Sequence, residues 1–259
     1  MPQDVLERLL LTTQQNQSAD DVWPATAAAI EVFWWRDGFS DARELAEDAI
    51  TRFSSRPGSF FDHDMPFDEA LLIGAVEAGD DPAAVLERVG RHVPEGSTLG
   101  KRLVWLQSEV AKGQPVHSLI TGFDMDLYSP LPAKPLRAAD AELAEQDPQN
   151  LSGSQRRRLW GASQRSRQPA IAIKLHDAGL EPQDWAMSFW LARQLVKAGR
   201  GDEAGAVLLA SLDLWFAEQP WHVAPAGITT QPDMRTAVTS ELREAVLNRI
   251  DVSSVPGVV

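Results

Sequence analysis

Apolar side chains recur along most of the chain at the spacing of an α-helix. Between residues 42 and 53 they lie at offsets of 3, 4, 7, 8 and 11, which places them on one helix face. They are Ala42, Leu45, Ala46, Ala49, Ile50 and Phe53. Ser40 precedes them and is a plausible N-cap for this helix. Runs of alternating apolar and polar residues, which would predict strands, are scarce. The pattern therefore predicts an all-α fold.

The order helix, glycine turn, helix recurs in residues 71–89, 103–120 and 190–215. A glycine suits the end of a first helix because it adopts the left-handed conformation at little cost. The turn glycines Gly38, Gly79 and Gly113 lie 41 and 34 residues apart, so the repeat is irregular. One helical hairpin cannot bury its own apolar face, so we expect the hairpins to stack as a solenoid.

Residues 188–216 resemble a tetratricopeptide repeat. The large and small positions of that family's two helices and its turn are matched by Leu191, Ala192, Leu195, Gly199, Ala204, Leu208 and Ser211. Ser188 and Phe216 depart from the family, which prefers tryptophan and proline there. Residues 26–54 fit less well. The resemblance implies a tetratricopeptide-like solenoid and transfers no enzyme activity.

A proline-rich segment, residues 128–138, divides the chain. It is the predicted linker between an acidic N-terminal helical half, residues 1–127, and a C-terminal helical-repeat half, residues 139–250. We expect the two halves to form one continuous domain. A second break, residues 217–234, is a long loop that carries Trp221 and His222.

The net charge of −13 is spread unevenly. Residues 1–150 contain 26 acidic and 12 basic residues, whereas residues 151–259 contain 11 and 12. Such a field repels nucleic acid and membrane phosphate and attracts a basic partner. The alternative is that the acidity only aids solubility. The N-terminus lacks the basic region of a secretory signal, and no stretch approaches the length of a membrane span. We therefore expect a cytoplasmic protein that binds neither nucleic acid nor membrane.

The densest set of potential metal ligands is Asp62, His63, Asp64, Asp68 and Glu69. Their alternative role is to begin a helix, where carboxylates favour the positive N-terminal end. A second His-Asp pair is His176-Asp177. The chain has no cysteine, no HExxH zinc motif and no GxSxG nucleophile motif. We expect no enzyme activity, no cofactor and no bound metal, with a metal-dependent hydrolase built on Asp62–Glu69 as the alternative.

Two further features concern binding. Tryptophan occurs nine times and is favoured in helix cores and at binding hot spots. Adjacent Trp34 and Trp35 cannot both face inward on one narrow stripe, so one should point to a neighbouring repeat or into a groove. Residues 154–167 contain five arginines around Trp160. Against the acidic background we interpret these as paired within the chain or solvated.

In composition and architecture the chain resembles the acidic, all-α bacterial immunity proteins that neutralise toxins. The resemblance implies a non-enzymatic module that binds a basic toxin domain. The expected charged surface comprises Asp37, Asp41, Glu44, Asp62, Asp64, Asp68, Asp80 and Asp81, with Trp34 or Trp35 as an anchor. A peptide-binding scaffold or regulatory protein is the alternative with the same fold.

Overall fold

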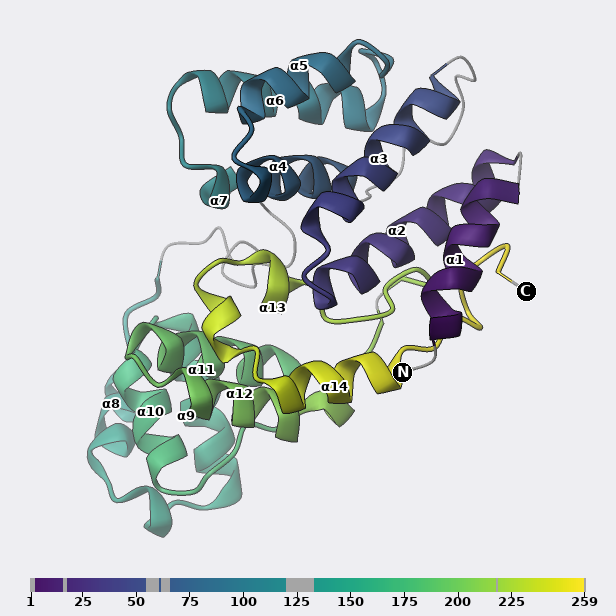
Figure 1. Cartoon of the computed structure of the whole chain (residues 1–259). Coiled ribbons are helices and arrows are strands. Elements are labelled where there is room, and N and C mark those ends of the chain that lie inside the picture. The colour runs from purple at the N-terminus through teal and green to yellow at the C-terminus, as the bar shows by residue number, and fades with distance from the viewer. Residues whose placement is uncertain are drawn as a thin grey trace. The chain divides into compact units, whose positions relative to one another are not determined.

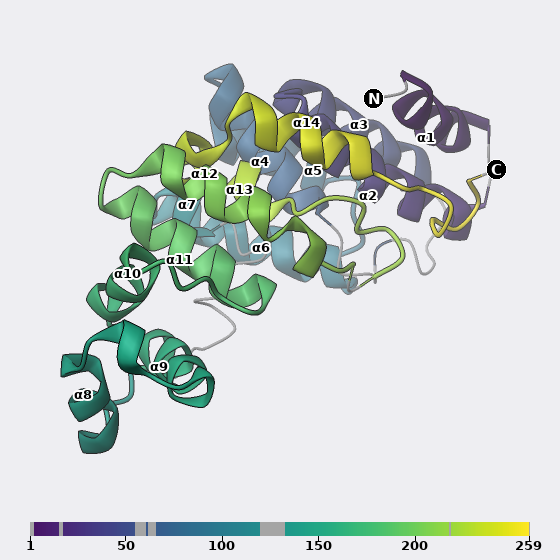
Figure 2. The same cartoon turned by 90° about the horizontal axis from the view of Figure 1, so that it is seen from below.

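The chain is helical throughout the part that its computed structural model describes. The described residues are 3–15, 18–54, 61, 66–119, 133–217 and 219–258. Within these ranges every regular element is an α-helix or a 3₁₀-helix, and none is a strand (Figures 1 and 2). The predicted all-α class is confirmed. The predicted linker falls partly outside the described residues, which resume at residue 133.

The helices belong to two compact units. Unit 1 comprises residues 1–122, 217–232 and 244–259, and unit 2 comprises residues 123–216 and 233–243. The helices of unit 1 are α1 (Gln3–Gln15), α2 (Ala19–Trp35), α3 (Phe39–Phe53), α4 (Phe67–Ala78), α5 (Pro82–Gly90), α6 (Thr98–Ala111), α7 (Val116–Leu119) and α13 (Gly227–Thr230). The last helix, α14 (Ser240–Arg249), contributes its final residues to unit 1 and its first to unit 2.

The core of unit 1 is built from helices that follow one another in the chain. Each of α1 to α4 packs against the next helix. The apolar face predicted for α3 is buried, because Ala42, Ala46, Ala49, Ile50 and Phe53 all belong to the core. Close approach of α4 to α3 requires Gly74. A Cβ there would lie 2.5 Å from the Cβ of Arg43 and 2.8 Å from the carbonyl oxygen of Phe39.

Unit 2 contains a second run of packed helices. They are α8 (Ala138–Glu145), η2 (Pro148–Asn150), α9 (Gly153–Arg165), α10 (Pro169–Asp177), α11 (Trp185–Lys197), α12 (Gly201–Ala210), η3 (Leu212–Leu214) and η4 (Met234–Ala237). Helices α11 and α12 form the hairpin for which the sequence predicts a tetratricopeptide-like repeat. Its matched helix positions, including Leu191, Leu195 and Leu208, are buried. Gly205 lets α12 approach η4, because a Cβ there would lie 2.6 Å from the carbonyl oxygen of Ala237.

Six helix ends share one hydrogen-bond pattern, in which a left-handed residue reverses the chain. At the end of α11 the amide of Gly199 donates to Val196 at 2.9 Å and the amide of Arg200 donates to Leu195 at 2.8 Å. Positive φ values mark the left-handed residue of each end, which is Asp37, Gly79, Gly113, Arg167, Gly179 or Gly199. Four of the six are glycines, as this conformation favours.

The first of these ends corrects a prediction. The sequence suggested Gly38 as the turn residue, but Asp37 takes the left-handed conformation with φ 57° and Gly38 has φ −83°. Aspartate tolerates this conformation better than most residues do. Helix α3 consequently begins at Phe39, with Gly38 rather than Ser40 at its N-cap position. The predicted role of Ser40 is therefore wrong.

A candidate protein-binding surface

The clearest surface feature of unit 1 is a row of carboxylates on α3. Asp37, Asp41, Glu44 and Asp48 are all exposed and follow one another at intervals of four, three and four residues. Asp41, Glu44 and Asp48 therefore lie on one side of α3, away from the buried alanine face, and Asp37 lies in the turn just before the helix. We call these four residues the α3 acidic stripe. The sequence reasoning selected the first three and missed Asp48, although the same helical spacing would have found it.

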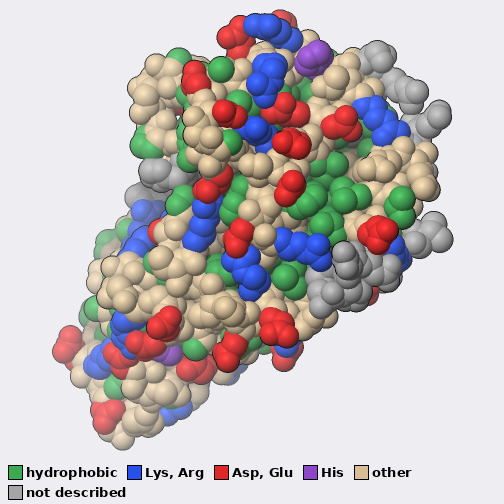
Figure 3. Space-filling model, in the orientation of Figure 1, with side chains coloured by type: hydrophobic (Ala, Val, Ile, Leu, Met, Phe, Trp, Pro, Cys, Tyr) green, Lys and Arg blue, Asp and Glu red, His purple; other side chains and the backbone are tan. Residues whose placement is uncertain are grey.

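Much of the remaining acidity in unit 1 is already neutralised. Glu47 lies on the side of α3 next to the stripe, and its carboxylate is 2.7 Å from Nη2 of Arg88. Arg43 lies 2.5 Å from the carboxylate of Asp80, and Arg91 pairs with Glu87. Acidic and basic side chains accordingly alternate over the face seen in Figure 3. In the described part of the chain no ion pair involves Asp41, Glu44 or Asp48.

Three other predicted surface acids have structural roles. Asp68 is only 7% exposed, and its carboxylate accepts a hydrogen bond from Nε of Arg102 at 2.9 Å. The prediction that Asp68 belongs to the charged surface is wrong, because a carboxylate in this environment needs a local cation. Asp80 is exposed but paired with Arg43. Asp81 is exposed and caps α5 by accepting from the amide of Ala83 at 3.0 Å. Asp62 and Asp64 lie outside the described residues.

The tryptophan anchor also differs from the prediction. Trp34 is 1% exposed and Trp35 is 0% exposed, so the expectation that one of them points outward is wrong. Both are buried because α2 contacts α1, α3 and α13 and so is enclosed on more than one side. Trp105 on α6 is instead 42% exposed, and the guanidinium carbon of Arg102 lies 4.5 Å from its ring centroid. Trp105 is therefore the most exposed of the nine tryptophans.

A buried acid in α2 holds the loop that precedes α13. Glu31 is fully buried, and one of its carboxyl oxygens accepts hydrogen bonds from the amides of Val223 at 2.8 Å and Ala224 at 3.1 Å. Burial raises the pKa of Glu31 from 4.5 to about 8, and the two backbone hydrogen bonds lower it only in part. Next to this contact, the rings of Trp221 and Trp23 meet edge to face at 4.4 Å between centroids. The sequence offered no signal for this pairing.

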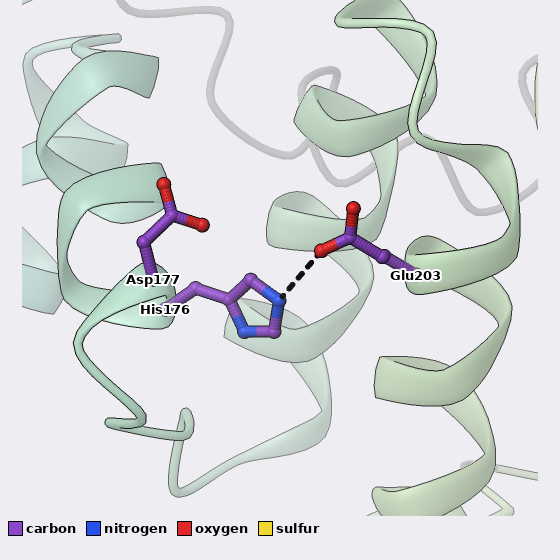
Figure 4. A group of neighbouring side chains, drawn as sticks. All are labelled: His176, Asp177 and Glu203. Atoms are coloured by element: carbon purple, nitrogen blue, oxygen red, sulfur yellow. Dashed lines mark ion pairs between the residues drawn. The ribbon is translucent and has the colours of Figure 1, made fainter.

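A group of potential metal ligands occurs in unit 2, shown in Figure 4. Potential ligand atoms of His176, Asp177 and Glu203 lie within 4.8 Å of one another. Arg200, however, donates to Asp177 at 2.6 Å and to both carboxylate oxygens of Glu203, at 2.8 and 2.5 Å. Its guanidinium neutralises the charge that a metal ion would otherwise balance. The group is therefore an ion-pair network that joins the end of α10 to the start of α12.

The predicted alternative metal cluster is only partly described. Asp62, His63 and Asp64 lie outside the described residues. Asp68 is paired with Arg102, and Glu69 is buried in the first turn of α4. The two described carboxylates thus stand where the alternative interpretation placed them, at the start of a helix.

Comparison with known proteins gives no match. No family model, no curated protein and no solved structure is similar to this chain. Over the described residues, the structure has no helix with the length and apolar character needed to cross a membrane. A functional proposal therefore depends on the surface of the molecule itself.

Proposed function

We propose that the protein is a non-enzymatic interaction module that binds a basic protein partner. The observation that carries the proposal is the α3 acidic stripe, whose members Asp41, Glu44 and Asp48 project from one side of a well-packed helix. A rigid helix presents these charges in a fixed row at little conformational cost. The most specific form of the proposal is an immunity protein that neutralises a basic toxin.

The stripe acts chiefly on the rate of association. A row of like charges steers an oppositely charged protein toward the surface and suppresses binding of acidic proteins. The effect weakens as salt rises because the Debye length shrinks from about 10 Å at 0.1 M salt to about 3 Å at 1 M. Packing of consecutive hairpins, as in a tetratricopeptide-like solenoid, is the architecture we propose for presenting such a surface. That arrangement suits a module that binds proteins and needs no cofactor.

The test compares two charge-reversed proteins with the same net charge. The first carries Asp41→Lys, Glu44→Lys and Asp48→Lys. The control carries Glu142→Lys, Glu145→Lys and Asp202→Lys, three exposed acids of unit 2. The partner is first identified by affinity purification from the native host, and association and dissociation rates are then measured with purified proteins across a salt series.

We expect the stripe variant to associate at least about tenfold more slowly than wild type at low salt, with little change in dissociation. The control should retain most of the wild-type rate, because its charges lie outside the stripe. If the partner is a toxin, co-expression of wild type should restore growth, and the stripe variant should restore it less well at the same expression level. Equal rates for the two variants would contradict a role for the stripe beyond net charge.

A further inference from the structure

A cleft of about 290 Å³ lies in unit 2, between α9 and the loop that follows α10. The wall formed by α9 includes Gly153, Arg156, Arg157 and Trp160. The last three lie three, four and seven residues after Gly153, so all four share one face of the helix. The opposite wall includes Leu180 and Glu181. The space beside Gly153 is open, since a Cβ built on it would meet no atom within 4 Å.

The cleft carries two arginines on its α9 wall and one carboxylate, that of Glu181, on the opposite wall, so its lining has a net positive charge. Arg158, the next residue along the helix, pairs with the buried carboxylate of Asp140. Arg156 and Arg157 take part in no ion pair within the described residues, and Arg156 donates from Nη2 to the backbone carbonyl of Gln149 at 3.2 Å. The carboxylate of Glu181, on the opposite wall, lies 3.6 Å from Nδ1 of His176.

A second observation concerns Arg156 itself. Its Nε–H group is buried and meets no acceptor among the described protein atoms. Buried donors are nearly always satisfied, because a donor removed from water without an acceptor destabilises the structure. The cleft also lies beside the first turn of α9, where the helix dipole favours negative charge. Ser152 caps this turn by accepting from the amide of Gln155, at 3.3 Å.

We propose that this cleft binds the oxyanion group of a small organic molecule. Guanidinium groups recognise the planar or tetrahedral oxygens of carboxylate and phosphate with paired hydrogen bonds. Leu180 adds apolar surface for a short carbon or ring portion of the ligand, and the buried Trp160 supports the α9 wall. The volume is at the lower limit of small-molecule sites, so the ligand is smaller than a folded peptide segment. This site lies in unit 2 and does not depend on the function proposed for the α3 acidic stripe.

Three probes of similar size distinguish binding of a phosphate, binding of a carboxylate and binding of the apolar ring alone. They are phenyl phosphate, benzoate and benzyl alcohol, titrated into the 259-residue chain by calorimetry and by protein-observed NMR at low salt. We expect phenyl phosphate to bind with a dissociation constant below about 1 mM, benzoate more weakly and benzyl alcohol not at all. Stronger binding of benzoate than of phenyl phosphate would identify the natural ligand as a carboxylate.

Two variants locate the site. Arg157→Gln should weaken phenyl phosphate at least about tenfold, because it removes a charge-assisted hydrogen bond. Gly153→Leu should weaken it as strongly while keeping both arginines, because the new side chain enters the cleft. The matched control is Arg167→Gln, which removes an exposed arginine just beyond the end of α9 and should bind like wild type.

The proposal is overturned if none of the three probes binds at about 10 mM, or if benzyl alcohol binds as well as the anions. It is also overturned if Arg167→Gln weakens binding as much as Arg157→Gln, since that result would indicate general attraction to positive charge. Circular dichroism and melting temperatures of each variant establish that the loss of binding does not follow from unfolding.

Discussion

The buried carboxyl group of Glu31 should make unit 1 less stable as pH rises. Its pKa in the folded protein is about 8, against 4.5 for an ordinary glutamate, because burial disfavours its charged form. Between these two pH values the folded state holds a proton that the unfolded state has released. The stabilising contribution is therefore complete below about pH 4.5 and is lost progressively as pH rises toward 8.

The size of the effect follows from the two pKa values. Each unit of pKa difference corresponds to about 1.4 kcal/mol, so the full contribution is about 5 kcal/mol and the loss between pH 5 and pH 8 is about 3–4 kcal/mol. This is a large share of the 5–15 kcal/mol typical of a folded domain. The hydrogen bonds from Val223 and Ala224 limit the loss because they stabilise the charged form.

Urea unfolding monitored by tryptophan fluorescence at pH 5, 6, 7 and 8 measures this dependence. The matched variant is Glu31→Gln, which keeps an oxygen acceptor for both amides and cannot ionise. We expect its free energy of unfolding to change much less with pH and to exceed that of wild type at pH 8. The difference between the two proteins removes the contribution of the histidines. Parallel pH profiles for wild type and Glu31→Gln would refute the reasoning.

Three further substitutions test individual parts of the fold. Arg167→Gly should raise the free energy of unfolding by about 1 kcal/mol in thermal or urea denaturation, because Arg167 occupies a left-handed position with φ 49° that glycine adopts freely; no gain would mean that the turn is not strained. Gly74→Ala should lower it by about 2 kcal/mol despite alanine's better helix propensity, because the new methyl group would collide with Arg43. Arg102→Gln should lower it by about 2 kcal/mol because it removes the guanidinium paired with the buried carboxylate of Asp68, and adding Asp68→Asn should restore most of the loss in a double-mutant cycle.

Features set by neighbouring residues could be predicted from the sequence. The buried face of α3 follows from the spacing of Ala42, Ala46 and Ala49, and several helix ends follow from their glycines. These signals act within one or two helical turns, so the sequence contains them directly. Asp37 shows where these local signals fail. The sequence Asp37-Gly38 does not determine which of the two residues takes the left-handed conformation at the end of α2.

Features that depend on distant segments could not be predicted. Trp34 and Trp35 are both buried because α2 is enclosed by several helices, and helical spacing within α2 does not reveal how many neighbours it has. Glu31 meets amides that lie 192 and 193 residues away in the chain. No local pattern distinguishes such a buried glutamate from one on a solvated face.

The pairing of charged side chains also depends on distant segments, so the sequence alone does not show which carboxylates are available to a partner. The sequence shows how many carboxylates unit 1 contains but not which of them face a local cation. Asp68 and Asp80 are held by Arg102 and Arg43, whereas Glu44 is exposed with no ion pair among the described residues. A basic partner would have to displace an arginine to reach the first two, and that competition removes most of the gain. We therefore expect the attraction between unit 1 and a basic partner to depend on the arrangement of the α3 acidic stripe as well as on the net charge of −13.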